Sequence, residues 1–368
     1  MAAGEWVVVV DPGSREVRAV ALRRGRGGRI EVAGYGVAPS QGIARGVVVD
    51  PFAASDAMRR ALQAVAHQSG VEVRSIRCAV ANGSGPARFP SGETASGSIP
   101  ALPPRPSGPT IDAGAAARWM AERRASGGTV RPDPALHRAA AGAGVLVEGW
   151  HAAAVAAGHA VLTGPESARR ILVIDLGAGS SMWGLWNAGS LEATGTVPIG
   201  GDRFTADLSI VLECDSETAE QLKCADGGVR VGSDSGKGIL YRRGDGAEGR
   251  ISSGELAEIL EARALEWLDW MQRSVGDWSG LDTVVLTGGG SRLRGMTELI
   301  LDRTGLSVRR GAPVADAWRG TPLEEPEASV LAGIAAFAFA GNAARANAPG
   351  WETSVRWLLE SWREWWRR

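Results

Sequence analysis

The hydrophobic pattern of the chain contains one block of elements twice. Residues 171–186 (ILVIDLGAGSSMWGLW) form an apolar run ending in Asp175, a turn of glycines and serines, and a second apolar run, and a further turn leads to LEATGTVPI. Near the N-terminus, WVVVVDPGS ends in the turn Asp11–Ser14, REVRAVALRR follows, and a Gly-rich turn leads to RIEVAGYGVA. Each triplet of predicted strands precedes a segment with helical spacing, near 53–68 and 202–213. The repeat predicts two halves with the same α/β fold.

The repeated turns have the composition of phosphate-binding hairpins. A strand that ends in Asp and turns through glycines offers backbone N–H groups and small hydroxyls to an anion. The carboxylate beside them suits a hydrated Mg²⁺, which takes one or two carboxylates plus phosphate oxygens. Asp11 and Asp175 stand at corresponding places of the repeat, so a nucleotide is expected in a cleft between the halves. A dinucleotide-binding turn would need a helix directly after its glycines, whereas Met182–Trp186 predicts a strand.

A third glycine-rich turn lies in LTGGGSRLRGMTELI, where a predicted strand leads into Gly288, Gly289, Gly290 and Ser291 and then into a helix. Its open backbone and the helix N-terminus suit the nucleoside and α-phosphate side of a ligand. Each Asp-x-Gly turn alone is a weak signal, because such turns are common. Their repetition in matching context, together with the third turn, carries the nucleotide prediction.

Composition excludes several other classes. The net charge of −1 gives no global field that would favour a nucleic acid. The 3 cysteines and 4 histidines have no metal-ligand spacing, and the cysteines fit a reducing compartment. The N-terminus lacks the basic region of a signal peptide. The most apolar stretch, 328–341, is shorter than the roughly 20 residues of a membrane-spanning helix and predicts a buried core helix.

The sequence WETSVRWLLESWREWWRR at 351–368 predicts an amphipathic helix after a flexible spacer. Trp favours the membrane–water interface, and Arg is stable beside anionic headgroups. A helix docked on its own domain or on a partner protein is the alternative. We favour the membrane because a linker precedes the helix and the chain stops there. The predicted membrane-binding residues are Trp351, Val355, Leu358, Leu359, Trp362, Arg363, Trp365, Trp366 and Arg367.

Several segments resemble the actin-like ATPase superfamily and, within it, the FtsA family of bacterial cell-division proteins. The paired strand–Asp-x-Gly–strand hairpins and the TGGGS turn are superfamily features. The more specific similarities lie in APSQGIARGVVVD, TVPIGGDRFTADLSIVL, AEQLK and LTGGGSRLRGM, and in the terminal spacer and amphipathic helix. The resemblance spans nearly the whole chain. It implies an α/β fold of actin/Hsp70-like, duplicated ribonuclease-H-like domains with a nucleotide cleft between them.

The resemblance also implies the ligands and partners. Proteins of this family bind ATP, polymerise, bind the tail of the tubulin-like protein FtsZ, and hold it to the inner membrane through the terminal helix. The expected cofactors are therefore ATP and Mg, with Asp11 and Asp175 holding the metal through water. The expected partners are the FtsZ C-terminal peptide, membrane lipid, a second copy of the chain and other divisome proteins, with no nucleic acid. The expected location is the cytoplasmic face of the membrane at the division site.

The nucleotide-binding residues implied by the resemblance fall into four groups. They are Asp11, Gly13, Ser14 and Arg15 in the first hairpin, Gly177, Ala178, Gly179, Ser180 and Ser181 in the second, Glu220 and Lys223 at the nucleoside, and Gly288 to Ser291 around the adenosine.

The chain departs from the family pattern at three positions of the hairpins. Met182 stands where the family usually has an acidic residue, Ala178 replaces the middle glycine, and Glu16 stands where a Lys is common. A carboxylate lost near the γ-phosphate predicts slow or absent hydrolysis. The inserted subdomain is expected to be shortened, as in a divergent member or paralogue.

The predicted domain limits follow these assignments and the changes in composition. They are 1–82 for the first part of domain I, 83–145 for the Pro- and Gly-rich insert, 146–170 for the return to domain I, 171–341 for domain II with a small subdomain at about 214–275 and last helices at about 328–341 that pack back on domain I, 342–350 for the linker, and 351–368 for the amphipathic helix.

Two other functions remain open. A pilus-assembly protein resembling PilM would share the fold and bind a short peptide of a membrane partner, but it would leave the terminal helix unexplained. A relative of the sugar kinases would need an Asp general base in the cleft for the substrate hydroxyl, and no such residue stands out.

Overall fold

The structure is a computed structural model that describes residues 6–25, 30–81, 87–88, 132–230 and 236–345. The predicted membrane-binding helix at 351–368 and most of the predicted insert lie outside these ranges. The division into domains stays a prediction.

Two sheets carry the fold, and they repeat one another. The first has the order β3-β2-β1-β6-β8, in which β1 to β3 are antiparallel and β6 and β8 run parallel to β1. In the second, β11-β10-β9-β14-β15 has the same order and the same strand directions. The strands of the first sheet are β1 (Trp6–Pro12), β2 (Glu16–Arg24), β3 (Ile30–Pro39), β6 (Ser75–Val80) and β8 (Leu146–Ala152). Those of the second are β9 (Arg170–Leu176), β10 (Ser181–Asn187), β11 (Ser190–Val197), β14 (Thr283–Thr287) and β15 (Ser307–Arg310). The predicted duplication is confirmed.

One further strand crosses between the halves. β7 (Ala87–Arg88) follows β6 of the first sheet in the chain, yet it pairs antiparallel with β11 at the edge of the second sheet. The chain after β6 therefore reaches the second half before it returns to the first through α3.

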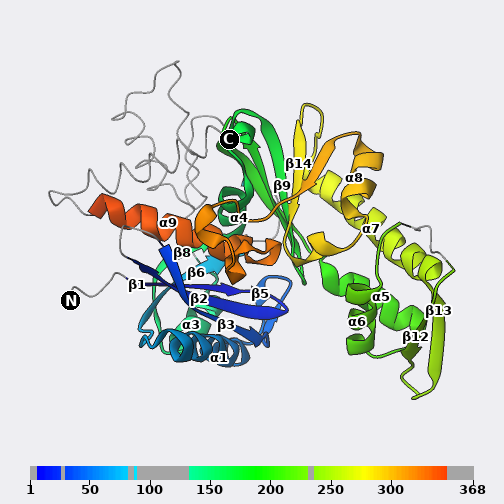
Figure 1. The fold of residues 1–368 in the computed structure, drawn as a ribbon, viewed down its shortest axis with the longest axis horizontal. Coiled ribbons are helices and arrows are strands. Elements are labelled where there is room, and N and C mark those ends of the chain that lie inside the picture. The colour runs from blue at the N-terminus through cyan, green and yellow to red at the C-terminus, as the bar shows by residue number, and fades with distance from the viewer. Residues whose placement is uncertain (1–5, 26–29, 82–86, 89–131, 231–235, 346–368) are drawn as a thin grey trace.

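Helices cover both outer faces and fill the space between the sheets (Figure 1). α1 (Pro51–Ser69) and α3 (Pro134–Gly142) pack on the outer face of the first sheet. α5 (Gly201–Leu212), α7 (Ser253–Val275) and α8 (Met296–Thr304) build the core on the outer face of the second. α6 (Ser216–Ala225) packs on α5, and β12 (Gly238–Arg242) pairs with β13 (Glu248–Ser252) at the far end of the second half.

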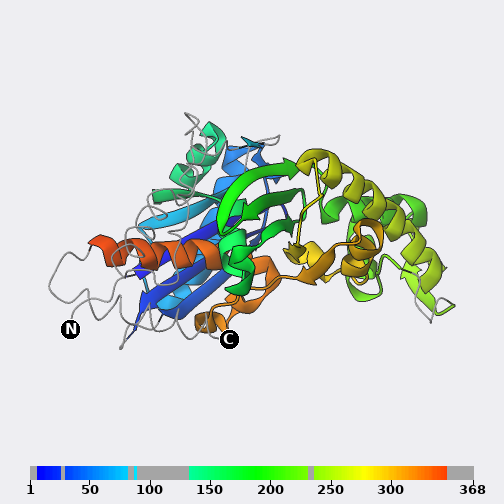
Figure 2. The ribbon, with the colours of Figure 1, turned by 90° about the horizontal axis from the view of Figure 1, so that it is seen from above.

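The two sheets share a middle layer made by α4 (Ala153–Val161) and α9 (Ser329–Arg345). Their alanine-rich surfaces pack closely, since a Cβ atom at Gly333 of α9 would lie 2.0 Å from the backbone oxygen of Ala156 in α4. Figures 1 and 2 both place α9 beside the strands of the first sheet, and α9 contacts β1 and β6 there. The layer therefore packs against the inner faces of both sheets.

Local signals in the sequence explain where the main helices begin and end. The carboxylate of Asp50 caps α1 by accepting from the N–H groups of Phe52 and Ala53, and Gly70 ends the helix with φ 69°. The helices predicted near 53–68, 202–213 and 328–341 are confirmed as α1, α5 and α9. Ser252 and Glu255 form a capping box at the start of α7.

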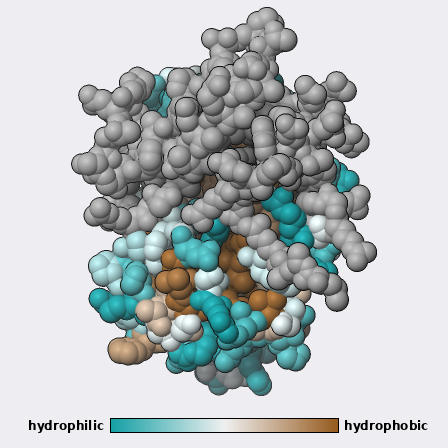
Figure 3. All heavy atoms as spheres, turned by 90° about the vertical axis from the view of Figure 1, so that its left-hand side faces the viewer, coloured by the Kyte–Doolittle hydropathy of each residue, from teal (hydrophilic) through white to brown (hydrophobic). Residues whose placement is uncertain are grey.

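A hydrophobic area bordered by hydrophilic side chains is visible on the end of the molecule that lies at the left of Figure 1 (Figure 3). Within the part of the chain that the structure describes, no helix combines the length and the apolar run needed to cross a membrane.

Candidate functional site

The two predicted phosphate hairpins meet. A Cβ atom at Gly179, in the β9–β10 turn, would lie 2.6 Å from Ser14 Oγ in the β1–β2 turn and 2.8 Å from the backbone nitrogen of Arg45. A Cβ at Gly13 would lie 2.8 Å from the backbone oxygen of Glu16. Only glycine allows these approaches. The structure therefore brings the first and second hairpins together at one place between the halves.

Each hairpin presents its Asp on the inner face of its sheet. Asp11 pairs with Arg18 across β1 and β2, and Asp175 pairs with Met182 at the equivalent place of β9 and β10. Their neighbours on the same faces line the middle layer, as Val9 does in the first sheet. Both carboxylates thus lie on the sheet faces that are turned toward the middle layer, at the ends of the strands where the hairpins meet.

The electrostatics of these carboxylates follow from burial and from each other. Burial raises the pKa of Asp11 to about 6, against the opposing charge of Arg18. Burial and the charge of Asp11 raise the pKa of Asp175 to about 7, and Arg18 again opposes the rise. The guanidinium of Arg18 lies 2.6 Å from Glu16 Oε2, so its charge is shared with a third carboxylate. The surroundings of these two carboxylates are therefore short of positive charge.

The carboxylates of Asp11 and Asp175 suit a hydrated divalent cation. The described residues contain no cluster of three or more His, Cys, Asp or Glu side chains that could hold a metal ion alone. One buried and one partly buried carboxylate with one shared guanidinium leave negative charge for a cation to neutralise. Mg²⁺ prefers such a set, completed by water and phosphate oxygens. Asp11 and Asp175 are the residues that would hold it.

The second hairpin is tied to the start of α5 through its carbonyl groups. Gly201 donates its N–H to the oxygen of Gly177 at 2.9 Å, and Asp202 donates to the oxygen of Ala178 at 2.8 Å. Among the described residues, the N–H groups of Ala178 and Gly179 have no protein acceptor. Backbone donors that are fixed in place and unused suit an anion.

The two serines of this hairpin point in different directions. Ser180 lies beside the first half, where a Cβ at Gly46 would be 3.4 Å from its Oγ. Ser181 is fully buried, and its Oγ donates to the oxygen of Ile199 at 2.6 Å and accepts from Trp267 Nε1 at 2.8 Å. The hydroxyl of Ser181 thus binds to groups in the core of the second half. Only the backbone of Ser181 is left for the predicted contact with a nucleotide.

Glu220 and Lys223 form a hydrogen-bonded cluster at the base of α6. Lys223 Nζ donates to Glu220 Oε2 at 2.7 Å, to Thr205 Oγ1 at 2.8 Å and to the oxygen of Gly201 at 3.0 Å. Burial acts to raise the pKa of Glu220, but hydrogen bonds from Lys223 and Thr205 outweigh it and hold that pKa below its usual range. Arg15 of the first hairpin reaches this cluster, with Nη1 at 3.3 Å from Glu220 Oε1.

The third glycine turn packs against the end of β9. A Cβ at Gly288, where φ is 79°, would lie 2.1 Å from Asp175 Oδ1, and one at Gly290 would lie 2.3 Å from Leu176 Cγ. The predicted order of strand, turn and helix is confirmed as β14, this turn and α8, but Gly289–Arg292 form a short 3₁₀ segment and α8 begins only at Met296. Ser291 is buried, and its Oγ donates to the oxygen of Gly288 at 2.7 Å. The turn therefore lies beside Asp175, and the N-terminus of α8 lies five residues further along the chain than Ser291.

The sequence patterns did not predict three residues of this region. Arg18 faces Asp11 across the hairpin. In a tight hairpin a residue of the second strand, here seven positions after Asp11, pairs with it, and this spacing was the available signal. Asp202 lies near Lys223, Glu220 and Arg15, and burial is the main cause of its raised pKa. Arg45 contacts Gly179 only through the tertiary fold, so no local pattern indicated it.

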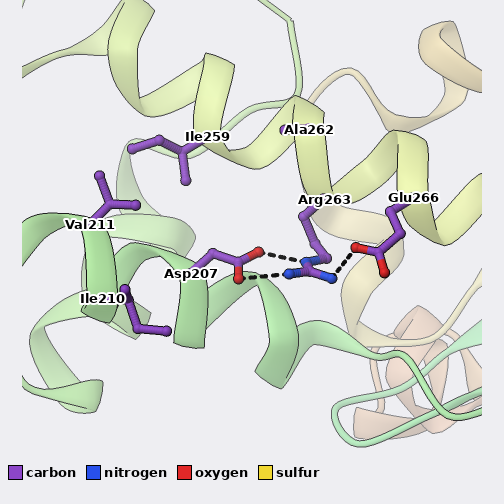
Figure 4. A pocket seen from close by; sticks show the side chains of 7 residues that line it. All are labelled: Asp207, Ile210, Val211, Ile259, Ala262, Arg263 and Glu266. Carbon is purple, nitrogen blue, oxygen red and sulfur yellow. Dashed lines mark hydrogen bonds and ion pairs between the residues drawn. The ribbon is translucent and has the colours of Figure 1, made fainter.

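A groove of about 360 Å³ lies outside the cleft, between α5 and α7 (Figure 4). Ile210 and Val211 are 74% and 58% exposed beside it. Arg263 makes two hydrogen bonds to Asp207, of 2.5 and 2.8 Å, and also pairs with Glu266. The lining residues are Asp207, Ile210, Val211, Ile259, Ala262, Arg263 and Glu266.

Comparisons with known proteins agree with this arrangement. The sequence profile of the family described as Cell division protein FtsA matches residues 172–333. The chain is 24% identical to the FtsA of Pseudomonas aeruginosa over 359 residues, which covers 84% of each protein. It is 32% identical to the FtsA of Neisseria meningitidis over 188 residues, which covers 49% of this chain and 45% of that protein.

Solved structures support the fold. MreB5 of Spiroplasma citri bound to ADP superposes with a TM-score of 0.61 at 16% identity, covering 94% of this chain and 99% of that one. The PilM–PilN type IV pilus biogenesis complex gives a TM-score of 0.59 at 18% identity, covering 90% of this chain and 97% of the other. With the duplicated sheets, these similarities show an actin-like fold, and the matched sequence segments show that the chain is similar to FtsA proteins over most of its length.

Proposed function

We propose that this protein binds ATP with Mg²⁺ in the cleft between its halves and acts as a cell-division scaffold that links FtsZ to the membrane. The observation that carries the nucleotide part is the contact of Gly179 with Ser14, above the carboxylates of Asp11 and Asp175. Two hairpins that offer N–H groups and hydroxyls to the same place suit a chain of phosphates. Arg15 and Lys223 supply positive charge at the side where the nucleoside is expected.

The residues around the predicted phosphate site favour binding of ATP without efficient hydrolysis. Met182 is half-buried and faces Asp175 across the β9–β10 pair, at the place where an acidic residue is usual in the family. A thioether is a weak acceptor and cannot take a proton from an attacking water. The nucleotide then serves as a conformational ligand that holds the two halves together. The structures of MreB5 of Spiroplasma citri with ADP and with AMPPNP support this type of ligand for the fold.

The groove between α5 and α7 is the surface that we assign to the FtsZ C-terminal peptide. Ile210 and Val211 leave apolar surface exposed there, beside the guanidinium of Arg263. The guanidinium is already paired with Asp207 and Glu266, so the groove suits a short peptide through the peptide's apolar side chains. The groove belongs to the second half and lies outside the nucleotide cleft, so both ligands fit at once.

Membrane attachment is proposed from the sequence of residues 351–368, which lie outside the described residues. A single amphipathic helix anchors weakly, and self-association of several copies would strengthen attachment through avidity. Nucleotide binding that favours self-association would therefore also favour attachment.

Liposome co-sedimentation tests the whole proposal. The full chain and a chain ending at Pro349 are compared on anionic vesicles with Mg-ATP, with Mg-ADP and without nucleotide. The proposal expects sedimentation that requires the tail and increases with ATP. If sedimentation requires the tail but does not depend on the nucleotide, the protein attaches to the membrane without regulation by nucleotide. If the full chain stays in the supernatant, the membrane role is contradicted.

A second assay tests the groove by fluorescence anisotropy with a labelled FtsZ C-terminal peptide. Ile210→Asp is expected to lower the peptide affinity at least about tenfold, because it places a charge in the apolar groove. Leu240→Asp is the matched control, since Leu240 is 61% exposed on β12, away from the groove. Equal binding by both variants would exclude the groove as the peptide site.

A further inference from the structure

A two-residue turn in the first half touches both phosphate hairpins. β4 (Ile43–Ala44) and β5 (Val47–Val48) pair antiparallel, and Arg45 and Gly46 join them. Both turn residues have positive φ, 52° at Arg45 and 75° at Gly46. Such a turn favours Asn-Gly, and an Arg in the left-handed region is sterically disfavoured. The geometry of the turn therefore does not explain why position 45 is an Arg.

The turn is fixed in place against the predicted phosphate site. Gly46 donates its N–H to Ser14 Oγ at 3.0 Å, and the backbone nitrogen of Arg45 lies 2.8 Å from where a Cβ of Gly179 would be. Its base is held as well, because Ser40 donates to the oxygen of Arg15 at 2.8 Å and Val49 donates to the oxygen of Gly42 at 2.8 Å. The turn is thus a third backbone segment of the site, contributed by the first half.

The side chain of Arg45 differs from the other arginines of this region. Arg15 pairs with Glu220 and Arg18 with Glu16, so part of each charge is already neutralised by the protein. Arg45 is exposed, and in the ranges that the structure describes no carboxylate pairs with it. It is therefore a cation beside both hairpins whose planar fork of N–H donors remains available, and such a fork matches the oxygens of a phosphate.

The direction of a bound nucleotide decides which phosphate Arg45 would meet. The residues assigned to the nucleoside, namely Glu220, Lys223 and the turn Gly288–Ser291, all belong to the second half. A nucleotide held there extends its phosphates toward the first half, so the last phosphate comes closest to the β4–β5 turn. We infer that Arg45 contacts the terminal phosphate of a nucleoside triphosphate and makes the site prefer a triphosphate to a diphosphate. The inference rests on the proposed nucleotide binding.

Isothermal titration calorimetry of the full chain with Mg-AMPPNP and with Mg-ADP tests this role. The variant Arg45→Asn removes the cation and installs the residue that the turn favours, so it should fold at least as well as the parent. Its affinity for Mg-AMPPNP is expected to fall about tenfold, while its affinity for Mg-ADP stays within about twofold. Arg45→Lys, which keeps the charge but loses the fork, should lie between the two. Arg74→Asn, which alters an exposed arginine paired with Glu72, is the matched control.

The possible outcomes separate this inference from the function on which it rests. If the unaltered chain binds neither nucleotide, the proposed nucleotide binding fails. If it binds both and Arg45→Asn loses affinity for both equally, Arg45 acts on the site as a whole and the preference for the terminal phosphate is excluded. Unchanged binding of both nucleotides by Arg45→Asn would remove Arg45 from the site.

Discussion

Arg15 and Glu220 form an ion pair across the mouth of the cleft, with 3.3 Å between Nη1 and Oε1. Arg15 belongs to the turn of the first half and Glu220 to α6 of the second, so the contact joins the two halves next to the proposed nucleotide. The side chain of Arg15 is half exposed, and such pairs contribute little to stability. The location of this ion pair matters more than its strength, because a nucleotide that competes for Arg15 or Glu220 would change how the two halves contact each other.

Lys223→Met is expected to weaken both stability and nucleotide binding. The Lys223 ammonium donates to Glu220, Thr205 and the carbonyl of Gly201, and its loss leaves a largely buried carboxylate with only the half-exposed Arg15 as a cationic partner. A penalty of about 1–3 kcal/mol in the free energy of unfolding at pH 7 follows. The other lysine of the chain, Lys237, is exposed and 3.6 Å from Asp226, so Lys237→Met is the control.

Urea unfolding of these two variants at pH 7 and at pH 4 checks the cause. Glu220 has a lowered pKa in the folded protein, so the stability that it contributes is present above its ordinary value of 4.5 and is lost as the pH falls through the folded value. The difference between Lys223→Met and the parent should therefore shrink toward pH 4. A difference that stays constant with pH would mean that Lys223 acts through packing.

Gly179→Ala should disrupt the contact between the hairpins. The added Cβ would lie 2.6 Å from Ser14 Oγ and 2.8 Å from the backbone nitrogen of Arg45, and neither atom belongs to a flexible chain end. The turns must separate, so nucleotide affinity is expected to fall at least about tenfold, measured by calorimetry. Gly236→Ala is the control, because a Cβ there meets nothing within 4 Å. Equal affinities for the two variants would show that the phosphates do not lie between the hairpins.

Asp175→Asn should stabilise the protein without nucleotide while weakening its response to Mg-ATP. The pKa of Asp175 is raised to about 7, so the folded protein holds this proton more tightly than the unfolded chain does. Stability therefore falls as the pH rises from about 4 to about 7 and is level above that. An uncharged Asn removes this loss, which amounts to roughly 2–4 kcal/mol at pH 8.

Thermal unfolding of Asp175→Asn at pH 5 and pH 8, with and without Mg-ATP, measures both effects. Asp269→Asn, at an exposed position of α7, should change neither. A variant that is less stable than the parent at pH 8 would contradict the assignment of a buried, unneutralised carboxylate. Undiminished stabilisation by Mg-ATP would exclude Asp175 as a metal-holding residue.

Local patterns predicted the repeated strands, the turns and the main helices, because alternation, glycines and caps act within a few residues. Local patterns could not predict whether a side chain points toward the predicted nucleotide site or into the core. Ser180 and Ser181 are neighbours of the same type, yet one lies beside the cleft and the other is bonded to Trp267 in the core. Strand register decides this, since one position of shift reverses every side chain.

The late start of α8 has a local cause that the pattern concealed. Gly295 adopts φ 82°, which a continuous right-handed helix does not allow, so the turn Gly288–Ser291 cannot lead directly into the helix. The contact of Arg45 with Gly179 joins residues far apart in the chain, and only the packing of the two halves creates it.

Arg18→Met should weaken phosphate binding by making the first hairpin resemble the second. Arg18 and Met182 occupy equivalent positions opposite Asp11 and Asp175, so the duplication places a cation in one half and an apolar side chain in the other. Arg18 lowers the pKa of both carboxylates, and without it both should rise further. Calorimetry with Mg-ADP is expected to give about a tenfold loss of affinity.

The reverse change tests the same argument, because Glu16 shares the charge of Arg18. Glu16 Oε2 lies 2.6 Å from the guanidinium, so Glu16→Gln frees that charge for a phosphate and should strengthen the binding of Mg-ADP. Opposite effects of the two variants would identify the pair as the element that sets phosphate affinity near Asp11 and Asp175. If both variants weaken binding, Glu16 holds Arg18 in its working orientation. If neither changes it, the phosphates are held by the hairpin backbones, and Arg18 only neutralises the two aspartates.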